Sequence, residues 1–118
     1  MITGHAIAAF AQSVLAGAFL DGHVVMLRLH RLNAVWGVVG LGYVQVVLTL
    51  LYWRRGGGAR WPALVSLGLA VAESVEVMLG LGRVIGIHIP LGVAIITANV
   101  LLAVWVWGGR LGRRGPAV

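Results

Sequence analysis

The chain contains no cysteine and no lysine, and only three of its 118 residues are acidic. The absence of cysteine excludes disulfides, thiolate zinc sites and iron–sulfur clusters. Charged residues make up 10% of the chain, where soluble domains have about 25%, while hydrophobic residues make up 60%. So little charge cannot cover a water-exposed surface, and the composition therefore indicates an integral membrane protein.

The nine basic residues are all arginines and lie at the ends of apolar runs. A net charge of +6 would also suit nucleic acid, but this placement is typical of membrane topology anchors, so we expect no nucleic-acid partner. The arginines divide into six on one predicted side (54, 55, 60, 110, 113 and 114) and three on the other (28, 31 and 83). This bias predicts a multi-pass protein of the cell membrane with both termini in the cytoplasm.

Four apolar runs predict four membrane-spanning helices over residues 2–20, 30–53, 61–82 and 87–107. About 20 residues of helix cross a hydrocarbon core of about 30 Å. Backbone groups in lipid must bond to one another within the segment, which favours helices over irregular chain. The predicted fold is all-α: one integral membrane domain over residues 1–118, folded as a transmembrane four-helix bundle.

A short internal repeat relates the two halves of the chain. Ala11-Gln12-Ser13-Val14 recurs as Ala72-Glu73-Ser74-Val75, and each copy precedes a histidine, His30 or His88, that begins the next apolar run. The repeat predicts two repeated helical hairpins related by a pseudo-twofold axis along the membrane normal. Such an axis would bring the two histidines to equal depth on opposite sides of the bundle.

His30 and His88 are candidate axial ligands of a haem. A haem iron accepts two imidazoles, and the core of a helical bundle is a common place for the site. Gly37 and Gly92 follow at helical spacing and would leave room for the macrocycle. Three arginines on the same side could pair with the propionates: Arg28, Arg31 and Arg83. The alternative is that both histidines simply lie at the headgroup level.

The other two histidines have weaker patterns. We expect His5 near the opposite membrane face, too far away to join the pair. His23 lies in the loop on the same side as the pair and is expected to be solvated. A zinc or copper site built from His23, His30, His88 and Asp21 is an alternative, although no tight ligand spacing favours it.

Glu73 and Glu76 lie within the third apolar run, three residues apart and therefore on one helix face. Carboxylates are expensive in lipid and usually have a partner or a function. They could share a proton, relay protons, or act with Asp21 as acid and base on a lipophilic substrate. Alternatively, they pair with the arginines at 28, 31 and 83 or bond to Gln12 and Gln45.

Leu29-His30-Arg31-Leu32 and Ile87-His88-Ile89-Pro90-Leu91-Gly92 resemble segments of the haem A synthase family and of related small, uncharacterised actinobacterial four-helix membrane proteins. Each four-helix half of those synthases has one histidine on its second helix and one on its fourth, and the pair ligates a haem in one half. This chain corresponds to a single half. It lacks the family's cysteine pair, and no glutamate precedes its first histidine as the synthase's catalytic residue would. The resemblance therefore implies haem binding through His30 and His88, without haem A synthesis.

The leading hypothesis is thus a small b-type haem protein for electron transfer or haem handling, with a redox partner. One alternative is a cofactor-free membrane enzyme that isomerises, cyclises or hydrolyses a lipophilic small molecule with Glu73 and Glu76. Another is a small transporter or assembly subunit. The small-residue helix faces would also suit a homodimer.

Overall fold

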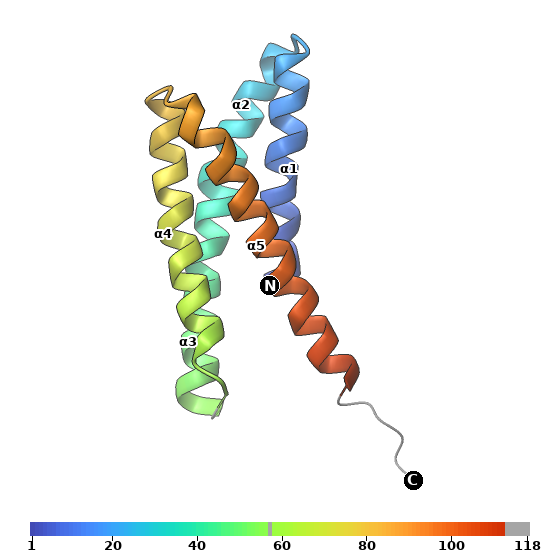
Figure 1. Ribbon diagram of the computed structural model, residues 1–118, viewed down its shortest axis with the longest axis vertical. Coiled ribbons are helices and arrows are strands. Elements are labelled where there is room, and N and C mark those ends of the chain that lie inside the picture. Colours follow the sequence, from blue (N-terminus) through green and yellow to red (C-terminus); the bar gives the residue numbers. More distant parts are fainter. Residues whose placement is uncertain (57, 113–118) are drawn as a thin grey trace.

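The computed structural model describes residues 1–56 and 58–112, with side chains as far as residue 109. This part of the chain is helical and contains no strand. Its elements are α1 (Ile2–Leu20), α2 (Val24–Leu32), the π-helical segment η1 (Asn33–Gly40), α3 (Leu41–Gly56), α4 (Trp61–Leu81) and α5 (Ile85–Gly112). The segments α2, η1 and α3 follow one another without a break, so the chain forms four rods (Figure 1).

The four rods form a ring in which each packs against its two neighbours. The helix α1 packs against α2, η1 and α5, while α4 packs against α3, η1 and α5. Within the described residues, the backbones of α1 and α4 do not come close to one another, nor do those of α2 and α5, although side chains meet across the axis. The structure is therefore a four-helix bundle in which α1 faces α4 across the axis and the second rod faces α5.

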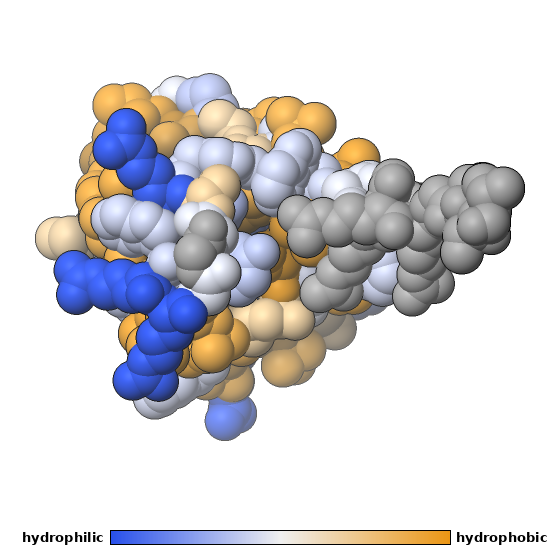
Figure 2. All heavy atoms as spheres, turned by 90° about the horizontal axis from the view of Figure 1, so that it is seen from below, coloured by the Kyte–Doolittle hydropathy of each residue, from blue (hydrophilic) through white to orange (hydrophobic). Residues whose placement is uncertain are grey.

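Each rod is long and apolar enough to cross a membrane: Ile2–Leu20, Val24–Gly56, Trp61–Leu81 and Ile85–Gly109. No more than 28% of any apolar window is buried inside the bundle. Most apolar side chains therefore face outward, and Figure 2 shows this surface around the hydrophilic end of the bundle. The predicted all-helical, four-helix architecture is confirmed at this level.

The second rod begins earlier than the sequence predicts. The turn at residues 21–23 contains Gly22 with a φ of 97°, a conformation that favours glycine. The chain resumes helical structure at Val24, so His30 lies inside the rod rather than at its start. By contrast, His88 lies in the first turn of α5, close to its predicted position.

The segment η1 changes which residues share a face with His30. A π-helix has more residues per turn than an α-helix, and it rotates the residues that follow. Gly37 packs toward α1, where an added Cβ would lie 3.5 Å from the Ala8 Cβ. It does not line the cleft that contains His30, so the predicted placement of Gly37 beside the histidine is wrong.

The helix α1 is displaced along the bundle axis. Figure 1 shows its N-terminal end near mid-height, well above the α3–α4 connection at the lower end. His5 is therefore buried in the middle of the bundle, with 0% of its surface exposed. Its predicted location near the opposite face is wrong, because the prediction assumed that the helices begin at one common level.

Asn33 joins η1 to α1 through two hydrogen bonds. Its Nδ2 donates to the Ala8 carbonyl at 2.8 Å and to Gln12 Oε1 at 2.9 Å.

Interhelical hydrogen bonds in membrane proteins contribute about 0.6 kcal/mol each, so Asn33→Ala should lower the free energy of unfolding in mixed micelles by about 1 kcal/mol. Thr97→Ala is the control, because Thr97 bonds only within its own helix. Equal losses in the two variants would contradict this role for Asn33.

Candidate functional site

A cleft of about 570 Å³ lies between α1, α2, η1, α4 and α5. It is on the side of the turns at 21–23 and 82–84, which are at the top in Figure 1. Small residues form part of its wall: Ala9, Ala16, Gly17, Ala34, Gly80 and Gly92. Its volume falls within the range of cofactor and ligand sites, about 300–1,000 Å³.

His30 and His88 meet in this cleft. Their ring centroids are 6.5 Å apart, with an angle of 77° between the ring planes. Two imidazoles bound through one nitrogen each to a single metal ion, at about 2 Å per bond, have centroids about 6 Å apart. The structure thus brings the two histidines from facing rods to a separation close to that of paired metal ligands.

Both rings are oriented through Nδ1. His30 Nδ1 lies 3.2 Å from the Gln12 carbonyl of α1, and His88 Nδ1 lies 3.1 Å from the Glu76 carbonyl of α4. A carbonyl oxygen only accepts, so Nδ1 carries the hydrogen in each ring. In the neutral rings Nε2 then holds the lone pair, and neither Nε2 has a partner among the described residues. This is the tautomer that binds a metal through Nε2.

Glu76 adds a carboxylate to the His88 side of the cleft. Its Oε1 lies 2.9 Å from His88 Nδ1, while its Oε2 has no hydrogen-bond partner. A carboxylate on the far nitrogen of a histidine fixes the ring and makes the ligating nitrogen more basic. Gly80 lies beneath the same ring, where an added Cβ would be 2.9 Å from His88 Cε1. Glu76 and Gly80 together determine how His88 is held.

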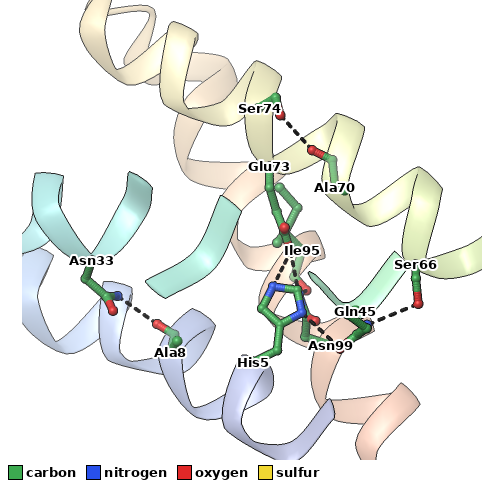
Figure 3. A network of polar contacts seen from close by, with 10 residues as sticks. All are labelled: His5, Ala8, Asn33, Gln45, Ser66, Ala70, Glu73, Ser74, Ile95 and Asn99. Atoms are coloured by element: carbon green, nitrogen blue, oxygen red, sulfur yellow. Dashed lines mark hydrogen bonds and ion pairs between the residues drawn. The ribbon is translucent and has the colours of Figure 1, made fainter. Parts of the chain in front are cut away.

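A second polar cluster lies deeper in the bundle and is buried from solvent (Figure 3). His5 Nε2 is 3.0 Å from Glu73 Oε1, an ion pair by distance without the alignment of a hydrogen bond. His5 Nδ1 lies 3.2 Å from Gln45 Oε1, and Gln45 Nε2 donates to Ser66. Asn99 Nδ2 also donates to Glu73 Oε1, at 3.0 Å. The cluster joins α1, α3, α4 and α5.

The remaining predicted site residues are only partly brought together. All three arginines are exposed at the same end of the bundle, and Arg31 lines the cleft, whereas Arg28 and Arg83 do not. Gly92 lines the cleft. Asp21 is exposed in the turn after α1 and is not part of the cleft wall, so it is not positioned to act with the two glutamates.

Neither glutamate has the partners that the sequence suggested. In the described part of the chain, both carboxylates form their ion pairs with histidines and neither with an arginine. The two carboxylates also point to different histidines, on α1 and α5. The zinc or copper alternative also finds no support in the described part of the chain, where no group of three His, Asp or Glu side chains could hold a metal ion. A haem needs only two protein ligands.

Sequence reasoning missed the pairing of His5 with Glu73, and it missed Asn33 and Gly80 altogether. A signal for the first was available: His5 and Glu73 are ionisable residues in predicted membrane spans, and such residues in lipid require partners. The role of Gly80 depends on the position of the His88 ring, which no local pattern reveals.

No family model, no curated protein and no solved structure matches this chain. The resemblance to haem A synthases stays a hypothesis that depends on the residues around His30 and His88. The function must therefore be argued from the cleft and the two His–Glu pairs.

The His5–Glu73 pair should show strong energetic coupling. Removing one partner of a buried ion pair costs about 3–5 kcal/mol, because the other is left without its counter-charge. We expect His5→Leu and Glu73→Leu each to lower the free energy of unfolding by that order. The double variant should cost much less than the sum in a double-mutant cycle. Additive losses would show that the two side chains do not interact.

Proposed function

We propose that this chain is an integral membrane protein that binds one haem b in the cleft, with His30 and His88 as axial ligands, and transfers single electrons. The observation that carries the proposal is the pair of imidazoles 6.5 Å apart, each with Nδ1 on a backbone carbonyl and with Nε2 unpartnered among the described residues. Metal-ligating histidines usually donate their other ring N–H to a carbonyl or carboxylate oxygen in this way.

The residues that line the cleft are suited to binding a haem. The volume of about 570 Å³ suits a cofactor, and the small residues of the wall leave room beside both rings. The free Nε2 atoms supply a pair of nitrogen donors, and Arg31 supplies a cation at the cleft for a propionate. Among the described residues, no third His, Asp or Glu side chain completes a metal-holding group of the kind that a zinc site would need.

Each residue has a separate task in this proposal. His30 and His88 hold the iron, and the Gln12 and Glu76 carbonyls keep their rings in the ligating tautomer. The Glu76 carboxylate makes His88 the more electron-rich ligand. Bound haem supplies a one-electron couple with both axial positions filled by protein. With no open position, electron transfer fits the site better than oxygen chemistry.

The same proposal places the bundle in a bilayer. The four apolar rods would cross it as two related hairpins, with the arginine-rich end in the cytoplasm. In each hairpin the histidine of the second helix bonds to a carbonyl of the first, to Gln12 in one and Glu76 in the other. This correspondence supports a repeat, with Gln12 matching Glu76 rather than Glu73.

Purified protein reconstituted with haem should show a Soret band and, after reduction with dithionite, a sharp α band. His30→Ala and His88→Ala should each lose the six-coordinate spectrum, because each removes one axial ligand. His23→Ala is the control, since His23 is exposed in the turn and does not line the cleft. A wild-type protein that stays colourless with added haem would refute the haem proposal.

Arg31 should matter more for haem affinity than the other two arginines on its side. Arg31→Gln removes the cation at the cleft wall, and loss of a charge-assisted hydrogen bond costs about 1.5–3 kcal/mol, roughly a tenfold or larger loss of affinity. Arg28→Gln and Arg83→Gln are matched controls, because both side chains lie outside the cleft wall. Haem titration measures all three. A larger loss in either control would place the propionates elsewhere.

One observation favours a second candidate, acid–base chemistry on a lipophilic substrate. Glu73 and Glu76 both line the cleft, and Oε2 of each is buried without a hydrogen-bond partner. Such carboxyl oxygens could exchange protons with a bound molecule. A colourless wild-type protein that converts a hydrophobic metabolite, with turnover lost in Glu76→Gln, would favour this function over haem binding.

A further inference from the structure

The buried His5–Glu73 pair has no task in holding the haem. It lies deeper than the two proposed ligands, and both of its side chains are fully buried. Burying an ion pair gains little stability over apolar side chains of the same size. The pair therefore calls for a role other than packing.

We propose that His5 and Glu73 take up a proton when the neighbouring haem is reduced and release it on oxidation, so that the protein carries one electron together with one proton. This inference rests on the haem site proposed above. The juxtaposition that supports it is Glu73, which lines the cleft shared by His30 and His88 and also contacts His5 beneath it.

The His5–Glu73 pair can bind a second proton, because one of its acceptor atoms has no partner. Glu73 Oε1 accepts from Asn99 and faces His5, whereas Oε2 is buried without a partner. With one proton, the pair is neutral whichever residue holds it. With two protons, an imidazolium and a carboxylic acid, it carries one positive charge. The pair can therefore switch by one unit of charge without breaking the network to Gln45 and Asn99.

An electron added in the cleft supplies the driving force. Charges interact strongly in an interior of low dielectric, so a nearby cation offsets part of the cost of the added electron. The other ionisable groups that face this region are His30 and Arg31 on α2, Glu76 on α4 and His88 on α5, while α3 contributes the neutral Gln45.

Each of those other ionisable groups already has a different role or a fixed charge. His30 and His88 would be ligands, Glu76 is bonded to His88, and arginine keeps its charge at any ordinary pH. In the balanced step, one electron comes from an external one-electron donor and one proton from water, and the pair passes from one bound proton to two. Oxidation returns the electron to an acceptor and the proton to water.

The test is the midpoint potential of the haem-loaded, full-length protein, measured by spectroelectrochemistry across the pH range in which histidine and carboxyl groups titrate. In the wild type the potential should fall as pH rises, because reduction takes up a proton. For one proton per electron, each tenfold drop in proton concentration lowers it by about 59 mV. His5→Gln/Glu73→Gln keeps polar side chains of similar size and should reduce this slope to less than half.

Ser66→Ala is the matched control. It removes the last hydrogen bond of the network, from Gln45, and leaves both titratable groups in place, so its slope should equal that of the wild type. Haem propionates contribute alike to all three proteins, and the difference between slopes isolates the pair. A flat wild-type profile, or an unchanged slope in the double variant, would overturn the proton coupling.

If the double variant does not accumulate, Glu73→Gln alone is tested by infrared difference spectroscopy of the reduced and oxidised protein. On reduction the wild type should either gain a carboxylic acid C=O band or, if Glu73 already holds the first proton, shift that band as His5 becomes an imidazolium. The variant should show neither change, and the same change in both proteins would overturn the proposal. Wild-type protein that binds no haem refutes the haem site itself, whereas haem with a potential independent of pH refutes only the proton coupling.

Discussion

Two carboxylates on one face of α4 must find partners inside an apolar bundle, and this requirement organises the structure. The Glu73 side chain has no exposed surface and the Glu76 side chain is only 15% exposed, so an unpaired charge on either would cost several kcal/mol. Each carboxylate is matched by a histidine from a different helix, His5 of α1 or His88 of α5. The positions of α1 and α5 along the bundle are the ones that make both pairs.

The two pairs differ in surroundings, and this difference separates their roles. His88 and Glu76 lie at the wall of the cleft, with side chains 22% and 15% exposed. His5 and Glu73 have no exposed surface and belong to a closed network with Gln45. His88 and Glu76 both border the cleft, whereas in the deeper pair only Glu73 borders it and His5 lies behind Glu73.

The segment η1 links the cleft to the core. It begins three residues after His30 and is tied to α1 by Asn33. π-helical segments are rare and are often found at functional sites. Here it turns Gly37 toward α1 while His30 faces the cleft. The second rod can thus pack against α1 and still present its histidine to α5.

Much of the architecture could be predicted from hydropathy alone. Runs of about 20 apolar residues between short turns predict helices, and α1 and α4 match their expected bounds closely, whereas the second rod begins at Val24 rather than at residue 30. The meeting of His30 and His88 could also be predicted, because each stands near the same end of a rod on opposite sides of the bundle.

The sequence by itself therefore determined the number of helices, their apolar outer surface and the end of the bundle where the two histidines meet. These depend on local composition and on chain order. The tertiary structure decided that His5 pairs with Glu73, that Gly37 leaves the cleft, and that Arg31 alone of the three predicted arginines lines it. Such features depend on how far α1 is displaced along the axis and how η1 rotates its rod. Both are set by packing between helices distant in sequence, which hydropathy and spacing do not record.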